Sequence, residues 1–136
     1  YKNEVPIGMI EFIPQKLVKR FGLCACRVDP AHNETTERYD LGKQFENYLF
    51  ISCFLVSEGY QGMGVGKALL NHLLNGEMFK DFDGALVYVT ERCEQWEKEI
   101  HWPAGPKEFY LKAGFAILKI LENPVGYLLC FKRNKI

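Results

Sequence analysis

The most informative part of the chain is YLFISCFLVSEGYQGMGVGKALLNHLL, residues 48–74. Its first segment, Tyr48–Val56, is nearly all apolar and has polar residues on both sides, which predicts a strand buried on both faces. A glycine-rich turn over 57–66 follows and leads directly into apolar residues at 65, 69, 70, 73 and 74. Their 3.6-residue period predicts an amphipathic helix, and Gly76 is well placed to end it.

Shorter patterns on both sides of this stretch complete the predicted fold. Before it, apolar runs predict a strand over Val5–Ile13, stopped by Pro14, and a second strand within 17–28. After it, we expect strands over 85–90, 115–121 and 127–132, a charged helical segment over 91–99, and a short helix over 107–113 closed by Gly114. This order of elements predicts one α+β (mixed α/β) domain over residues 1–136.

Composition restricts the classes of protein to which this chain belongs. Of its 136 residues, 48% are hydrophobic and 25% are charged, which is typical of one soluble globular domain. Seventeen basic residues balance seventeen acidic ones, so the chain lacks the net charge of a dedicated nucleic-acid binder. No window approaches the roughly 18 apolar residues of a membrane span, and the N-terminus has neither a signal pattern nor Met. We therefore expect no membrane or nucleic-acid partner, and a chain that begins inside a longer protein.

The cysteines indicate a reducing compartment. There are five, an odd number, and Cys53 and Cys130 lie inside apolar runs, which favours buried, reduced thiols over a disulfide framework. Cys24 and Cys26 have no second ligand pair at metal-binding spacing. The expected localisation is therefore cytoplasmic, and no metal is expected.

The glycine-rich turn predicts an anion site. Gly62, Gly64 and Gly66 carry no Cβ, so a bulky anion can approach the backbone closely. The helix that follows begins with unpaired N–H groups and an effective charge of about +0.5 from the macrodipole. A phosphate or pyrophosphate is the expected ligand, although such glycines also occur where a turn only needs tight packing.

Two known phosphate-binding loops fit this turn poorly. The P-loop requires a leading glycine where Gln61 stands and a hydroxyl where Ala68 stands. The dinucleotide fingerprint requires a third glycine where Lys67 stands, and we find no clear strand–helix–strand unit with an acidic residue about 20 positions further on.

A third phosphate-binding motif fits. Gln61-Gly-Met-Gly64-Val-Gly66 matches Q/R-x-x-G-x-G/A between a strand and a helix, and so resembles the acyl-CoA motif of the GNAT superfamily of N-acyltransferases. Downstream, Phe109-Tyr110-Leu-Lys-Ala-Gly114-Phe115 resembles the family's F-Y-x-k-x-G-F segment. The resemblance covers residues 48–133 well and residues 1–47 in outline. It implies a mixed, mostly antiparallel sheet flanked by helices.

The resemblance implies an acetyl-CoA site with assigned residues. Gln61 would shape the loop. The strand before the loop would separate from the next strand, and in that gap the pantetheine arm would pair with the backbone of Phe54, Leu55 and Val56 as an added strand. Lys67 would add charge near the phosphates, unless it is an ordinary solvated lysine. The CoA pyrophosphate would be held by backbone N–H groups of the loop residues Gly62, Met63, Gly64, Val65, Gly66 and Lys67.

The resemblance also implies direct transfer of an acetyl or longer acyl group from CoA to an amine, without a covalent enzyme intermediate. Tyr110 occupies the position of the general acid and stays protonated at neutral pH, since a free tyrosine has a pKa of about 10. Its alternative role is that of a core tyrosine beside Phe109 and Phe115. The motif strand carries no acid, which leaves Glu11, Glu91 or an ordered water as the base; Glu58 is expected to face solvent.

Departures from the family keep other functions open. Members usually place a strand and two helices before the first strand predicted here, and those helices form one wall of the acceptor site. Their absence from this sequence motivates a second hypothesis, a non-catalytic acyl-CoA-binding or interaction domain of a larger protein. A nucleotide-phosphate binder is a third hypothesis. The acceptor amine is not identified, and a homodimer is compatible with the resemblance.

Overall fold

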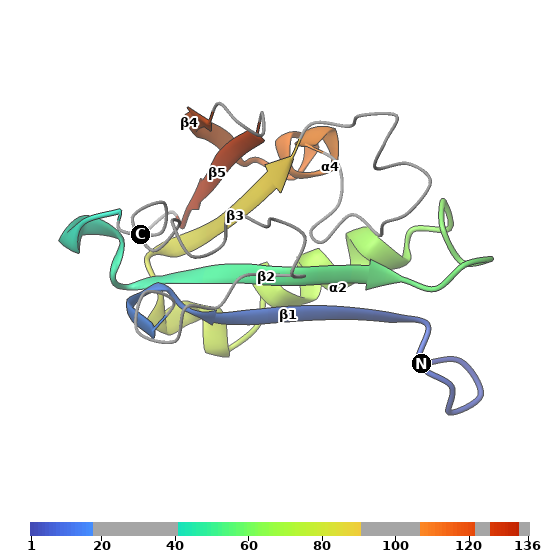
Figure 1. Cartoon of the computed structure of the whole chain (residues 1–136). Coiled ribbons are helices and arrows are strands. Elements are labelled where there is room, and N and C mark those ends of the chain that lie inside the picture. The colour runs from blue at the N-terminus through green and yellow to red at the C-terminus, as the bar shows by residue number, and fades with distance from the viewer. Residues whose placement is uncertain (18–40, 91–106, 122–125, 134–136) are drawn as a thin grey trace.

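The computed structural model describes residues 1–17, 41–90, 107–121 and 126–133 (Figure 1). Five strands form one sheet in the order β1-β2-β3-β5-β4. The strands are β1 Gly8–Pro14, β2 Tyr48–Val56, β3 Gly84–Thr90, β4 Ala116–Leu121 and β5 Gly126–Lys132. The helices are α2 Val65–Leu74 and α4 Lys107–Lys112, with 3-10 turns η4 Lys43–Phe45 and η5 Met78–Asp81.

The sheet is mixed and mostly antiparallel, as expected. The pairs β1–β2, β3–β5 and β4–β5 are antiparallel, and β2–β3 is parallel. The parallel pair is joined through α2, so β2–α2–β3 is a strand–helix–strand unit that the sequence analysis did not recognise. The unit is hard to recognise in the sequence because β3 begins ten residues after the end of α2, and the turn η5, which was not predicted, lies between them in the chain.

The predicted elements agree with the structure best in the central stretch. β2 and the start of α2 lie where the apolar patterns place them, but α2 ends at Leu74 with Asn75 as its cap, one residue before Gly76. β1 begins at Gly8, later than predicted, and includes Pro14 as its last residue, paired with Leu49. This position is compatible with proline because β1 is an edge strand of the described sheet. The strand predicted within 17–28 lies, apart from Leu17, outside the described residues, as does the helical segment predicted over 91–99.

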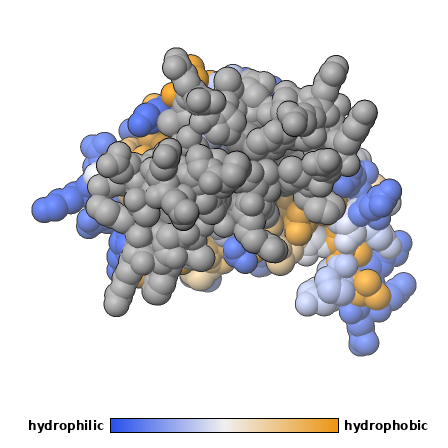
Figure 2. All heavy atoms as spheres, in the orientation of Figure 1, coloured by the Kyte–Doolittle hydropathy of each residue, from blue (hydrophilic) through white to orange (hydrophobic). Residues whose placement is uncertain are grey.

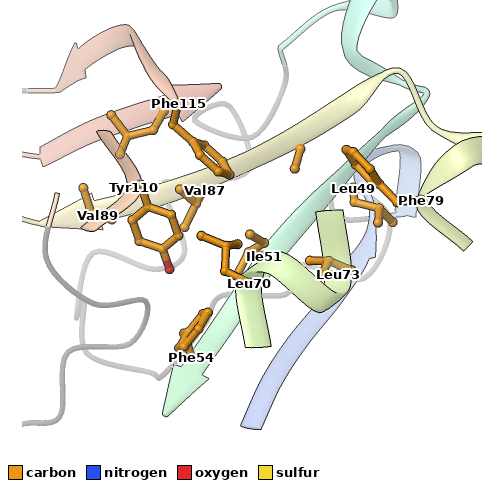
Figure 3. Packing of buried hydrophobic residues seen from close by; sticks show 12 residues of the cluster. Leu49, Ile51, Phe54, Leu70, Leu73, Phe79, Val87, Val89, Tyr110 and Phe115 are labelled. Atoms are coloured by element: carbon orange, nitrogen blue, oxygen red, sulfur yellow. The ribbon is translucent and has the colours of Figure 1, made fainter. Parts of the chain in front are cut away.

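Apolar side chains pack on both faces of the sheet. We call the face that carries α2, η5 and α4 the helical face; its cluster includes Ile51, Leu70, Phe79 and Tyr110 (Figure 3). We call the other the opposite face; its smaller cluster comprises Phe45, Tyr48, Phe50, Leu86 and Cys130. In Figure 1, α2 runs behind β2, which places the helix on the same side as the larger cluster.

The surface near the N-terminus projects from the sheet. Residues 1–6 are exposed, and Figure 2 shows this region as mostly hydrophilic with a small hydrophobic area. Among the described helices, none is long and apolar enough to cross a membrane.

Candidate functional site

Strands β2 and β3 separate before either one ends. Their parallel pairing extends from Tyr48–Gly84 to Ile51–Val87, and the described residues form no further pair beyond it. Beyond it, residues 53–56 of β2 stay paired with β1, and residues 52–56 have no partner strand on the β3 side among the described residues. Figure 1 shows the two strands diverging toward their carboxyl ends. This agrees with the separation that the family resemblance implies, and it leaves backbone groups of β2 available on one edge.

A bulge in β2 lies where the separation begins. Glu11 pairs with Cys53 and Phe12 pairs with Ile51, so Ser52 is the extra residue opposite β1. The bulge changes the alternation of the strand: Leu49 and Ile51 contribute to the core on the helical face before it, and Phe54 does so after it. The large side chains of β2 therefore reach the core of the helical face both before and after the bulge.

The glycine loop connects the diverging end of β2 to α2. At its start the Ser57 N–H donates to the Ile7 carbonyl at 2.8 Å. Gly62 and Gly64 have φ values of 76° and 83°, which side chains other than glycine rarely adopt. A Cβ at either position would meet no atom within 4 Å. Tight packing therefore does not account for these two glycines, whereas a turn with an open outer surface does.

The first turn of α2 is suited to an anion. Gly64 is the N-cap, no side chain caps the helix, and no acidic residue stands in the first turn. The first N–H groups of a helix have no intrahelical acceptor, so they can donate to a ligand. Lys67 is exposed in this turn. The Gln61 side-chain amide donates to the Val56 carbonyl at 3.3 Å, which ties the loop to the end of β2.

Tyr110 lies fully buried beside the unpaired half of β2. Its ring contacts those of Phe54, Phe109 and Phe115 in edge-on geometry, with centroids 6.4, 5.1 and 5.3 Å away. In Figure 3 its hydroxyl points toward the side of Phe54. Burial, and to a lesser degree the nearby Cys53 thiol, raise the pKa of Tyr110 well above its ordinary value. The phenol therefore stays protonated over the physiological range.

The candidate carboxylates have different surroundings. Glu11 is exposed on β1, and its carboxylate accepts a hydrogen bond from the Ser52 hydroxyl at 2.6 Å. Glu58 is exposed in the glycine loop, as expected. Glu91 lies outside the described residues. Glu11 is thus the candidate base whose surroundings the structure defines. Its hydrogen-bond donor, Ser52, is a residue that the sequence analysis did not single out.

A signal for Ser52 is present in the sequence. It is the single aliphatic hydroxyl residue within the apolar run of β2, and it is 3% exposed. A buried hydroxyl requires a partner, and so its presence in such a run indicates a specific hydrogen bond. Among the described residues there is no group of three or more histidine, cysteine or acidic side chains arranged to hold a metal ion.

The described residues thus combine a mixed sheet, two parallel strands that diverge, a glycine loop and a helix N-terminus without a side-chain cap, an arrangement in which the backbone can receive a phosphate-bearing ligand. The model of the acetyltransferase (GNAT) family matches residues 1–91, which is 91 of the 136 residues. The chain therefore belongs to the acetyltransferase (GNAT) family, whose members transfer acyl groups from acyl-CoA. The match includes the glycine loop and ends before the Phe109–Phe115 segment.

The fold is also found among solved structures. A structure described as "The crystal structure of acetyltransferase" is similar over 97% of this chain, with a TM-score of 0.56 and 15% sequence identity. At this identity the likeness concerns the fold alone. This chain covers 66% of the length of that protein. A search of curated proteins finds no match.

Proposed function

We propose that this chain is an acyl-CoA-dependent N-acyltransferase that transfers an acetyl group to an amine by direct attack. The observation that carries the proposal is the early end of the β2–β3 pairing, with a glycine loop and an uncapped helix at one edge and a buried phenol beside it. These features combine a place for the phosphates, a place for an extended arm and a proton donor.

The loop residues fit the diphosphate of CoA. The open surface over Gly62 and Gly64 lets an anion reach the backbone, and the first N–H groups of α2 provide donors. In this proposal the backbone of Gly62–Lys67 binds the diphosphate, while Gln61 holds the loop against β2 through the Val56 carbonyl. Lys67 adds a positive charge near the diphosphate. Because its side chain is exposed, dissolved salt screens this charge.

The free edge of β2 fits the pantetheine arm. Phe54, Leu55 and Val56 have β1 partners in Ile10, Met9 and Gly8, so their pairing on the other edge remains open among the described residues. An extended ligand that carries amides can add to this edge as a strand does. The Val56 carbonyl already accepts from Gln61, and its second lone pair leaves room for one more donor.

Tyr110 is proposed as the general acid. The amine nitrogen attacks the thioester carbonyl carbon, and collapse of the tetrahedral species breaks the carbon–sulfur bond. The departing thiolate takes the phenolic proton of Tyr110, which is present at neutral pH because a phenol has an ordinary pKa of about 10. The proton lost by the amine passes to Glu11, to Glu91 or to water, and exchange with solvent restores both groups after product leaves.

Calorimetry and a turnover assay test the proposal together. We expect acetyl-CoA to bind with a micromolar dissociation constant and unliganded CoA to compete with it. ATP should compete much more weakly, because it lacks the arm that pairs with β2. Release of CoA thiol is then followed with a panel of small primary amines, amino acids and lysine-containing peptides. Binding without turnover of any amine would instead favour a non-catalytic acyl-CoA-binding domain. No binding at millimolar acetyl-CoA contradicts both functions.

A further inference from the structure

We propose that Ser52 is a positioning residue that fixes the Glu11 carboxylate where β2 and β3 separate, and that Glu11 there accepts the proton of the attacking amine. This inference rests on the proposed function and makes it more specific, because it selects one base among the candidates and adds a residue. It is carried by the 2.6 Å hydrogen bond from Ser52 Oγ to Glu11 Oε1 and by the place of both residues in the sheet.

The first step concerns the face on which Glu11 lies. Its neighbours Ile10 and Phe12 pack against the core of the helical face. Side chains alternate along a strand, so Glu11 points to the opposite face, as Ile13 does. The hydrogen bond brings Ser52 to that same face. Tyr110 belongs to the helical face, so the phenol and the carboxylate lie on different sides of β2.

The second step concerns the bulge. Ser52 has no register partner on β1, because Cys53 pairs with Glu11 and Ile51 pairs with Phe12. The hydroxyl of this extra residue also lies 3.3 Å from the Glu11 backbone carbonyl, so it is held directly against Glu11. Bulges redirect side chains and occur next to active sites. Here the redirected side chain belongs to the first residue of β2 beyond its pairing with β3.

The third step concerns what the bond does for Glu11. An exposed glutamate usually samples many rotamers, whereas this one has an oxygen held by a nearly buried hydroxyl. Among the described residues no cation pairs with it, and its other oxygen has no partner, so that oxygen can accept a proton. The neighbouring groups on this face of β1 and β2 are uncharged, with Met9 and Leu55 exposed. Cys53, its register partner, is the nearest titratable group along β2.

The fourth step joins the two groups into one reaction path. Ser52 and Phe54 lie two residues apart in the unpaired half of β2, and Phe54 contacts Tyr110. A thioester placed along that edge would have the carboxylate on one side of the strand and the phenol on the other. The amine would lose its proton to Glu11 on the opposite face, while the thiolate would gain one from Tyr110 on the helical face. Both transfers then occur without the two groups competing for one proton.

A double-mutant cycle tests this arrangement, using acetyl-CoA and the amine with the highest turnover in the panel. Glu11→Gln should lower kcat about 100-fold, as expected for loss of a general base. Ser52→Ala should lower kcat about tenfold, since it removes a bond to a charged group. The double variant should be no slower than Glu11→Gln alone, because Ser52 acts through the carboxylate. Acetyl-CoA KM should stay unchanged in all three.

Two additional readouts separate positioning from a packing role. Ser52→Thr keeps the hydroxyl and should recover most of the activity that Ser52→Ala loses. Ser52→Ala should lower kcat and leave the KM for acetyl-CoA unchanged, because the bond it removes holds Glu11 and not the CoA ligand. Glu46→Gln, an exposed carboxylate change beyond the other end of β2, serves as the matched control and should behave as the wild type.

The outcomes distinguish this inference from the function on which it rests. If the wild type transfers acyl groups and Glu11→Gln turns over normally, or if the losses in the double variant multiply, the positioning role is wrong and the proposed function stands. If the wild type binds acetyl-CoA but acylates no amine, both are wrong. Thermal unfolding of each variant identifies a loss of activity that comes from a loss of folded protein.

Discussion

The two halves of β2 are chemically similar in sequence and have different neighbours. Residues 49–51 are paired with β1 on one edge and with β3 on the other, Tyr48 is paired with β3, and all four residues are buried. Beyond them, residues 53–56 are paired with β1 and have no second partner strand among the described residues, and Leu55, near the glycine loop, is 37% exposed. One strand thus provides both the centre of the sheet and the edge of the candidate site.

The difference shows how a rigid site can be built on a sheet. A strand with an open edge in mid-sheet has unpaired N–H and C=O groups, which would be unfavourable if they were buried without a partner. The first half offsets this by fixing β2 through two ladders, so the second half stays extended while one edge remains open. The site therefore inherits its geometry from the paired half, and changes to the two halves should have separable effects on folding and on ligand binding.

The largest expected effect comes from a methyl group added to the paired half. In Gly84→Ala the new Cβ would overlap the Phe131 carbonyl and lie 2.5 Å from the Tyr48 ring. Backbone cannot move away from that position without breaking the start of the β2–β3 pairing, so we expect a loss of at least about 3 kcal/mol in the free energy of unfolding. Thermal melting followed by circular dichroism measures it.

The matched change next to the open half is Gly66→Ala, in the first turn of α2, which packs against Phe54 of that half. Its Cβ would lie 3.5 Å from Phe109 and Phe54, which is ordinary contact distance. Alanine favours a helix over glycine by roughly 0.5–1 kcal/mol, so the melting temperature should stay or rise. The Q/R-x-x-G-x-G/A pattern also admits alanine here, and acetyl-CoA affinity should be retained. Equal destabilisation by the two changes would contradict the distinction between the halves.

The second effect concerns the phenol beside the open half. Tyr110→Phe keeps the aromatic cluster and removes one hydroxyl, so kcat should fall about 100-fold while acetyl-CoA affinity stays within about twofold.

The raised pKa of Tyr110 also predicts how the stability of the wild type and of this variant differ at high pH. A group whose folded pKa is raised contributes stability below its unfolded pKa, near 10, and loses it as the pH rises beyond that value. The variant should therefore lose less stability than the wild type between neutral pH and pH 11.

A wild-type rate in Tyr110→Phe would leave this residue with a packing role. That result would not affect the loop or the β2 edge as an acyl-CoA site, because their evidence is independent of the phenol. Phe109→Leu is a useful control, since it disturbs the same aromatic cluster without removing a proton donor. It should lower stability and leave the turnover of the folded fraction close to that of the wild type.

The sequence predicts those features of the two halves of β2 that depend on neighbouring residues, and it does not predict those that depend on residues far away in the chain. The bounds of β2 and the start of α2 follow from local apolar periodicity, and the glycine loop follows from local residue type. The separation of β2 from β3 came from the family resemblance. Nothing in the apolar run itself marks Ile51 as the last residue paired with β3. Strand pairing depends on residues far away in the chain.

The bulge and the Ser52–Glu11 bond could not be predicted for the same reason. The two residues are 41 positions apart, and the bond depends on a register shift between strands. Glu11 was a candidate because of its residue type, whereas its orientation required the pairing of β1 with β2. Tyr110 shows the opposite case: its motif predicted the position, and the structure adds the full burial that keeps the proton on the phenol.

The smallest expected effect tests the loop itself. Gly64→Ala places a side chain at φ 83° in the left-handed region, which costs about 1–2 kcal/mol and rotates the amides of the turn out of line. We expect acetyl-CoA to bind about tenfold more weakly by calorimetry, with a modest fall in melting temperature. The effect is limited because the Cβ itself meets no atom within 4 Å and the remaining N–H groups of α2 are untouched.

Gly42→Ala is the matched control for this strain. Gly42 also has positive φ, at 86°, and a Cβ there would likewise meet nothing within 4 Å, but it precedes η4 at the other end of β2. It should lose stability by a similar or larger amount and bind acetyl-CoA as the wild type does. If both variants weaken binding equally, affinity follows overall stability and the loop has no special part in it. A loss confined to Gly64→Ala assigns the binding to the turn between the open half of β2 and α2.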